Sequence, residues 1–191
     1  MTKAEWLTSV NPQAMLGALY GTGTPTDDEP SDRKLWLFVC ACCRLQGVKS
    51  LIVDSYEQDG PPLDSGNDRL SDGEWARQWT CPKYGGVSDE SRAALLRDIF
   101  GNPFRPWVVA QRDKDARALR EYQIFDLSWL SSTVTSLAER IYAERDFASM
   151  PILADALEDA GATDLQILNH CRLDGVHVRG CFLLDLLLGK S

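Results

Sequence analysis

Residues 31–47, which read SDRKLWLFVCACCRLQG, carry the clearest structural signal in the chain. Ser31 is a residue type that caps helix N-termini, and Gly47 is the residue type found most often just beyond a helix C-terminus. Between them, apolar side chains recur at the spacing of one helix face, namely Leu35, Phe38, Val39, Cys42 and Leu45. The segment therefore predicts a helix over 32–46.

Similar start and stop signals extend outward on both sides of this segment. Further starts are Thr2 with Glu5, Asn11-Pro12, Ser71 with Glu74, Ser88, Met150-Pro151 and Thr163. A last helix is predicted over 176–188. No alternating run is long enough to predict a strand, although 104–109 is a candidate extended segment. We therefore expect an all-α fold, an irregular bundle of eight or nine short helices in a single domain over 1–191, with a loop-rich insertion around 59–90 as a small appendage.

The composition excludes several classes of partner. Of the 191 residues, 28 are acidic and 20 basic, and the basic ones form no run, so neither nucleic acid nor an anionic membrane is an expected partner. The longest apolar run, 182–188, is interrupted by Asp185 and is far shorter than the ~20 residues of a membrane-spanning helix. With 44% apolar residues, a chain of this length can bury a core without metal or disulfide. A metal site must therefore be argued from its ligands.

Six cysteines occur, at positions 40, 42, 43, 81, 171 and 181. Three of them crowd one apolar segment, and no signal peptide pattern precedes them. We therefore expect reduced thiols and a cytoplasmic protein. Cys40, Cys42 and Cys43 are interpreted as small core residues, with a metal site joining them to the C-terminal His/Cys residues as the alternative.

The strongest candidate for chemistry lies near the C-terminus. A helix over 176–188 would place His177, Cys181 and Asp185 on one face, with His170 and Cys171 a short loop earlier. Zinc binds thiolate and imidazole, so the predicted metal ligands are His170, Cys171, His177 and Cys181. Two alternatives stay open. Cys181 can be a core residue while Asp185 pairs with an arginine, or Cys181 can be a nucleophile activated by His177 and Asp185.

Two further pairs have both a functional and a structural interpretation. Trp75 and Trp79 share a helix face beside a Pro/Gly-rich segment, and they either form an exposed protein-binding spot or pack the appendage onto the core. Arg97 and Arg105 flank the helix stop at 101–103, where they either hold an anion or bind a neighbouring helix.

Several strings together resemble a known family. They are AEWL at 4–7, SDRKL at 31–35, CACCR at 40–44, LLRDIFGNPFRP at 95–106, LADALEDAG at 153–161, HCR at 170–172, HVRGC at 177–181 and LLLGK at 186–190. The chain is similar in these strings to a large paralogous family of uncharacterised proteins from planctomycete bacteria. The resemblance weakens between 48 and 90. It implies a bacterial, cytoplasmic setting and supplies no mechanism.

The sequence contains no P-loop, dinucleotide-binding turn, HExxH or GxSxG motif, and only two histidines. The first hypothesis is therefore a non-enzymatic interaction or regulatory module whose partner is another protein. The alternative is a helical protein that binds a zinc-type metal through its C-terminal His and Cys residues. An enzyme of unrecognised class is a further alternative, and no cofactor other than zinc is expected.

Overall fold

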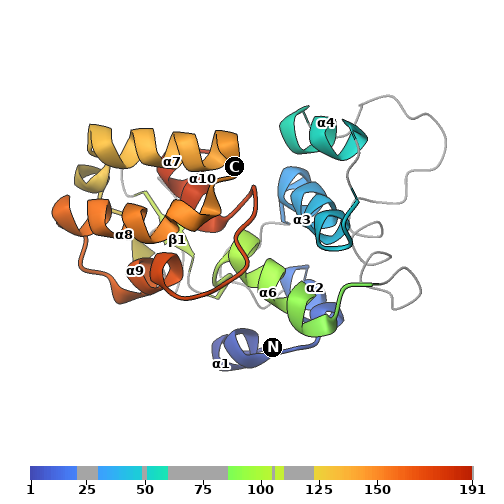
Figure 1. Ribbon diagram of the computed structural model, residues 1–191. Helices are drawn as coiled ribbons and strands as arrows, with labels where there is room; N and C mark the ends of the chain where they lie inside the picture. The colour runs from blue at the N-terminus through green and yellow to red at the C-terminus, as the bar shows by residue number, and fades with distance from the viewer. Residues whose placement is uncertain (21–29, 49–50, 60–85, 105, 110–122, 191) are drawn as a thin grey trace.

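The computed structural model describes residues 1–20, 30–48, 51–59, 86–104, 106–109 and 123–190 (Figure 1). The all-α prediction is confirmed, since nine α-helices lie in these ranges. They are α1 (Lys3–Thr8), α2 (Pro12–Leu19), α3 (Asp32–Leu45), α4 (Leu51–Asp59), α6 (Asp89–Phe100), α7 (Ser132–Glu144), α8 (Met150–Asp159), α9 (Leu165–Arg172) and α10 (Phe182–Leu188). Short 3-10 turns occupy Leu127–Trp129 (η3) and Phe147–Ser149 (η4). None of the described helices has the length and apolar character needed to cross a membrane.

A two-residue parallel ladder joins β1 (Trp107–Val108) to β2 (Gln123–Ile124). It begins within the stretch 104–109 that was the candidate extended segment. The predicted appendage around 59–90 falls largely on 60–85, which lie outside the described residues, as do Trp75 and Trp79.

Most helices begin at the residues that the sequence predicted. The Thr2 hydroxyl and the Glu5 side chain form a reciprocal capping box, and the Ser31 hydroxyl accepts the N–H of Lys34. The predicted start at Thr163 is wrong by one residue. Asp164 caps α9 instead, because its carboxylate accepts the N–H groups of both Gln166 and Ile167.

The predicted helix over 176–188 is wrong in its first half, because α10 begins only at Phe182. Gly180 has φ +91°, and a Cβ at this position would lie 2.7 Å from Leu37 Cδ1. The Val178 N–H donates to the Asp98 carboxylate at 3.0 Å. Contacts with α3 and α6 therefore override the local helical pattern in residues 176–181, and His177, Cys181 and Asp185 do not share a helix face.

The described helices enclose two main apolar cores. The N-terminal core is built by α1, α2, α3 and α6, and its largest members include Trp6, Met15, Phe38, Leu96 and Ile99. The C-terminal core is built mainly by α7–α10, and its members include Ile141, Leu153, Leu157, Leu168 and Leu184. Figure 1 shows α7–α10 grouped on the left of the view and α3 on the right, with α6 below α3.

Trp6 connects α1 to the end of α6. Its side chain is fully buried, and its indole N–H donates to the carbonyl oxygen of Gly101 at 2.8 Å. From α6, Arg97 donates back to the carbonyl oxygens of Trp6 and Ser9, at 3.2 and 2.8 Å. The structural interpretation of Arg97, which binds a neighbouring helix end, is therefore confirmed, while Arg105 lies outside the described residues.

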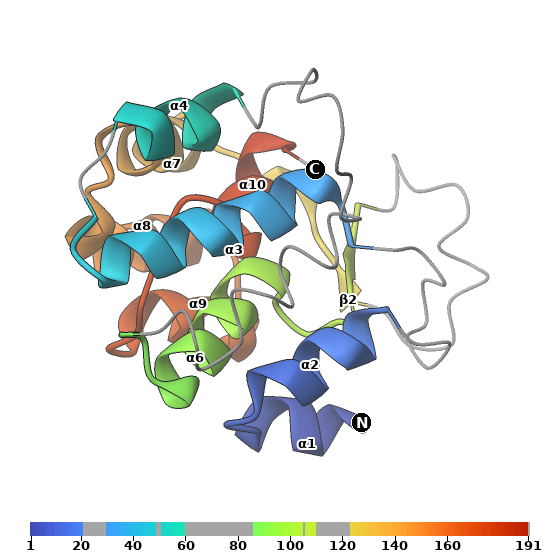
Figure 2. The same cartoon turned by 90° about the vertical axis from the view of Figure 1, so that its right-hand side faces the viewer.

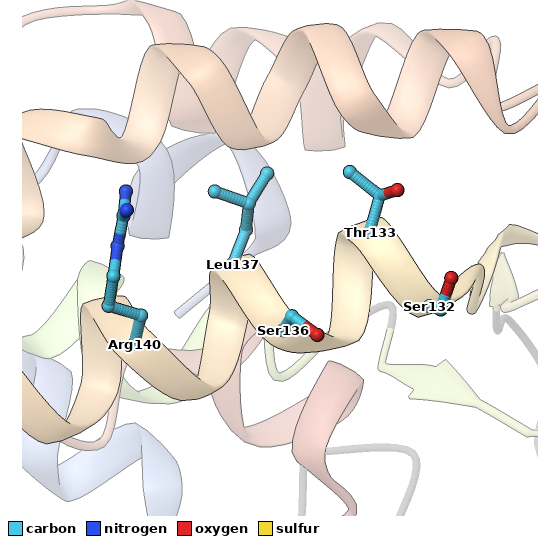
Figure 3. A pocket seen from close by; sticks show the side chains of 5 residues that line it. All are labelled: Ser132, Thr133, Ser136, Leu137 and Arg140. Carbon is cyan, nitrogen blue, oxygen red and sulfur yellow. The ribbon is translucent and has the colours of Figure 1, made fainter.

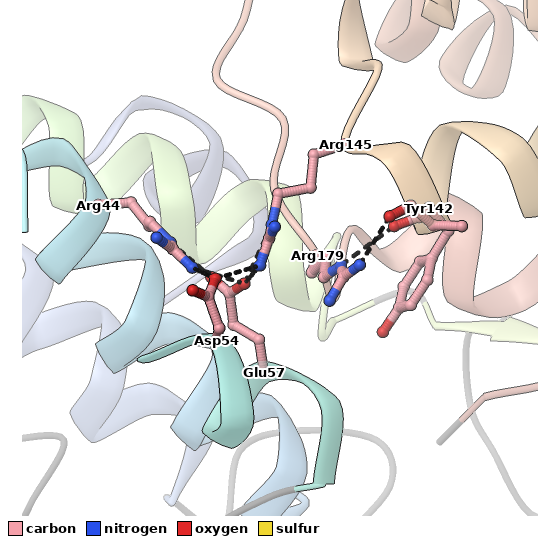
Figure 4. Close-up of polar contacts among 7 residues, drawn as sticks. Arg44, Asp54, Glu57, Tyr142, Arg145 and Arg179 are labelled. Atoms are coloured by element: carbon pink, nitrogen blue, oxygen red, sulfur yellow. Dashed lines mark hydrogen bonds and ion pairs between the residues drawn. The ribbon is translucent and has the colours of Figure 1, made fainter. Parts of the chain in front are cut away.

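Ion pairs cross between the two cores. Figure 2 shows the start of α3 beside α10, where the Arg33 guanidinium donates to both Asp185 oxygens at 2.8 and 3.0 Å and to the Tyr142 hydroxyl at 2.7 Å. The interpretation of Asp185 as the partner of an arginine is thus confirmed. Farther along, Arg145 at the end of α7 and Arg44 of α3 both pair with Asp54 and Glu57 of α4 (Figure 4).

Candidate metal centre

Four side chains with metal-ligating atoms converge where the two cores meet. Asp98 comes from the last turn of α6, His170 from α9, His177 from the segment before α10, and Cys181 from the N-cap of α10. One ligating atom of each lies within 4.8 Å of the other three. Three of the four predicted ligands therefore meet, although through a non-helical segment rather than along one helix face.

Asp98 is at the centre of this cluster and is almost completely buried. Its Oδ1 is 2.8 Å from His177 Nδ1 and 3.4 Å from His170 Nε2, while its Oδ2 accepts the Val178 N–H. Burial acts to raise the pKa of Asp98, but the hydrogen bonds from His170 and His177 oppose it, and the net result is a lowered pKa. Asp98 is therefore a carboxylate anion at neutral pH.

His170 and Cys181 form the other half of the cluster. His170 Nε2 is 3.1 Å from Cys181 Sγ, and the His170 ring meets the His177 ring edge-on at a centroid distance of 4.9 Å. Cys181 is fully buried, and this burial, together with the charge of Asp98, holds the pKa of its thiol well above the usual value. Without a cation nearby, Cys181 is therefore a neutral thiol.

The hydrogen bonds of the cluster do not satisfy all of its polar atoms. His177 Nε2 is buried and has no hydrogen-bond partner among the described residues. Such an atom costs about 1–3 kcal/mol when left unpaired. The ring nitrogen that faces Asp98 is Nδ1, so the unpaired Nε2 is a separate cost of burying the His177 ring.

The donor set suits a transition metal. One thiolate, two imidazoles and one carboxylate are the ligands that zinc prefers, whereas magnesium and calcium favour oxygen alone. Zn–N bonds of about 2.0 Å and Zn–S bonds of about 2.3 Å place tetrahedral ligands roughly 3.3–3.6 Å apart. Three of the separations, 2.8, 3.1 and 3.4 Å, lie near this range, and no two of the four ligating atoms are more than 4.8 Å apart, so the side chains would have to adjust to hold an ion.

The cluster is largely shielded from solvent. The most exposed of the four side chains is that of His170, at 18%, and that of His177 is at 8%. A catalytic zinc ion keeps an open position for water, whereas a structural one is enclosed by four protein ligands. The burial here matches the structural type.

Cys171, the fourth predicted ligand, lies outside this cluster. It follows His170 on α9, and successive helical residues point about 100° apart. Its side chain is buried in the C-terminal core, and burial raises the pKa of its thiol to about 12. Cys171 is thus placed as a core residue.

The cysteines of α3 are also buried, and burial raises the pKa of Cys40 and of Cys42 to about 12. They do not belong to the four-residue cluster, so the alternative of a site shared between α3 and the C-terminal residues gains no support. The nucleophile hypothesis gains none either. Asp185 pairs with Arg33, and a reactive cysteine needs an accessible thiolate, which Cys181 does not provide.

Asp98 is the ligand that the sequence did not reveal. It lies far from the two histidines along the chain. One local signal was present, since Asp98 follows Leu95 by three residues and precedes Ile99 on an apolar face. An acidic residue buried there needs a partner, and this requirement marks it as a candidate.

A surface pocket elsewhere offers no comparable chemistry. It lies along α7 and is lined by Ser132, Thr133, Ser136, Leu137 and Arg140, of which Figure 3 shows Thr133, Leu137 and Arg140 on one side of the helix. Hydroxyls, one leucine and one guanidinium do not form a metal-binding or nucleophilic set. The protein-binding prediction for Trp75 and Trp79 falls outside the described residues.

Comparison with known proteins adds no assignment. No protein-family model matches the chain, and no curated protein or solved structure matches it. Membership of the planctomycete family stays a prediction.

Proposed function

We propose that the protein binds one divalent metal ion of the zinc class through Asp98, His170, His177 and Cys181. The observation that carries this proposal is the convergence of the four ligating atoms within 4.8 Å of one another in a buried place. The residues come from two helices, a helix cap and a connecting segment, so no single local motif accounts for their meeting.

Charge supports the proposal. A divalent ion bound by the Asp98 carboxylate and the Cys181 thiolate, with two neutral imidazoles, gives a site of zero net charge, which burial tolerates far better than a lone anion. A bound metal also reverses the effect of burial on the thiol, because coordination removes its proton. The raised pKa of Cys181 is thus the property of the metal-free protein only.

The shielded geometry favours a structural ion over a catalytic one. From the sequence alone, metal binding is the alternative to an interaction module. The geometry of the cluster gives metal binding the stronger support. It is compatible with a non-enzymatic interaction module, because a metal-stabilised scaffold can present a binding surface elsewhere. That surface and its protein partner stay predictions.

Elemental analysis tests the proposal. Protein purified without chelator and reconstituted with zinc should hold about one ion per chain. Cobalt substitution should add the absorption bands of a cobalt–thiolate bond, which report Cys181 directly.

The chain offers a matched pair of variants. Cys181→Ala and Cys171→Ala each remove one buried thiol. We expect Cys181→Ala to lose the ion and the cobalt–thiolate bands, and Cys171→Ala to keep both. Zinc content below about a tenth of an equivalent in the reconstituted wild type, or equal loss in the two variants, would contradict the proposal.

A further inference from the structure

Metal binding and the docking of the two cores depend on the same residues. We infer that the metal ion regulates how firmly α9 and α10 dock onto α3 and α6, so that metal binding and docking are thermodynamically coupled. This inference rests on the proposed function, because it concerns the same site.

The ligands belong to different cores. Asp98 lies on α6, whose neighbours Leu95, Leu96 and Ile99 belong to the N-terminal core. His170 and Cys181 lie beside Cys171 and Leu184 of the C-terminal core. An ion bound by Asp98 and by Cys181 therefore joins the two cores directly.

The segment that carries His177 completes the site only when it is docked. Its residues Val176 and Val178 pack against the N-terminal core, and Gly180 lies against Leu37 of α3. The Val178 N–H donates to Asp98. The position of His177 is thus set by contacts with α3 and α6 rather than by the helices on either side of it in the chain.

Docking brings the buried Asp98 carboxylate close to the Cys181 thiol, because these two residues come from different cores. A bound cation neutralises the carboxylate and binds the thiolate. It therefore favours the docked state over any state in which the segment has separated from α6.

Coupling is reciprocal, so a change that weakens docking away from the ligands must weaken metal binding. The Arg33–Asp185 contact is such a place. It joins α3 to α10, Asp185 is 1% exposed, and neither residue is a member of the four-residue cluster. Loss of the Arg33 guanidinium leaves the Asp185 carboxylate with a weaker cationic contact from Lys34, whose Nζ is 3.8 Å away.

The test is the zinc affinity of Arg33→Gln, measured by chelator competition on the full chain. The matched control is Arg172→Gln, because Arg172 pairs with Asp155 and Glu158 on the same side of the molecule and does not cross between the cores. Each variant removes one positive charge, which by itself favours a cation. A fall in affinity for Arg33→Gln therefore reports docking rather than electrostatics.

We expect Arg33→Gln to weaken zinc binding about tenfold or more, and Arg172→Gln to stay within about twofold of the wild type. If the wild type binds zinc and Arg33→Gln binds it equally well, the coupling is refuted while the proposed function stands. If the wild type binds no zinc, the proposed function itself fails.

Hydrogen exchange on the wild type gives a second measurement that does not depend on a variant folding. Zinc should slow amide exchange along α10 and in α3 around Leu37, beyond the ligands themselves. Slowing confined to Asp98 and residues 170–181 would also refute the coupling.

Discussion

The substitution Asp98→Asn removes the negative charge of the proposed metal ligand and changes the shape of the side chain very little. Asn keeps one oxygen, which can still accept the Val178 N–H that lies 3.0 Å from Asp98 in the wild type. It replaces the other oxygen by an NH₂ group, which faces His177 Nδ1, 2.8 Å away. A lost charge-assisted hydrogen bond of this kind costs about 1–3 kcal/mol, so the metal-free variant should be destabilised by that amount.

Metal binding should suffer more, because the variant has lost one of two anionic ligands. Changes to residues that merely support a metal ligand weaken affinity by about 10–100-fold, so loss of a ligand should reach at least about 100-fold. At a free zinc concentration of about 100 times the wild-type Kd, zinc stabilises the wild type by about 2.7 kcal/mol. A Kd raised about 100-fold reduces this stabilisation to about 0.4 kcal/mol in the variant.

Urea denaturation without zinc measures the destabilisation of the metal-free variant, and the same experiment with zinc measures how much the ion stabilises each protein. The comparison requires that the slope of unfolding free energy against urea concentration is the same for all samples. Asp155→Asn is the control, since Asp155 is exposed and pairs with Arg172 outside the cluster. It should keep the full stabilisation by zinc. Equal stabilisation of Asp98→Asn and the wild type would show that the carboxylate is not a ligand.

The same variant makes a separate prediction about pH. The pKa of Asp98 is lowered in the folded protein, so its contribution to stability is present above the unfolded pKa of about 3.9 and is lost as pH falls through the lower folded value. The metal-free wild type should therefore lose stability in this acidic range more steeply than Asp98→Asn. If the free energy of unfolding changes equally with pH in the two proteins, Asp98 is not the charged group inferred here.

Three further predictions follow from other features of the structure. Zinc must displace the proton of the Cys181 thiol, whose pKa is raised, so zinc affinity should increase roughly tenfold per pH unit near neutrality. Titration calorimetry in two buffers should detect the released proton, and an affinity independent of pH would refute the thiolate ligand. Gly180→Ala should destabilise the protein by about 1–3 kcal/mol in thermal unfolding, because its Cβ would lie 2.7 Å from Leu37 Cδ1 and its φ is positive; a neutral result would mean that the segment is not docked as described. Ser131→Ala should cost about 1 kcal/mol by loss of the N-cap of α7, whereas Ser132→Ala, one residue into the helix, should be close to neutral, and equal effects would show that capping is not the cause.

The sequence predicted the helices well wherever the deciding interactions are local. Caps such as Ser31 and Ser88, and the stop at Gly101, act within one helical turn, so their residue types carry the information. The segment around His177 differs, because Gly180 packs on Leu37 and Val178 donates to Asp98. Tertiary contacts of this kind are not visible as a periodic pattern, and the apolar spacing there predicted a helix that does not form.

Three of the four residues of the candidate site were predicted from the sequence, but from a helix that does not form at His177. His170, His177 and Cys181 were selected because a helix would align the last two with Asp185. They do meet, but through a turn that ends at the N-cap of α10, and Asp185 points to Arg33 instead. Asp98 could not be found by spacing, because its proximity to the histidines exists only once α6 and α9 have packed.

The burial of Trp6 has a practical consequence for anyone who shortens or extends the N-terminus. Of the six residues of α1, Trp6 is the buried one, and its indole reaches the carbonyl oxygen at the end of the helix that bears Asp98. Trimming the first nine residues would remove this indole together with the two backbone oxygens that hold the Arg97 guanidinium. These contacts hold the helix that carries Asp98, so the geometry of the cluster depends on a short N-terminal segment that contributes none of its four ligands.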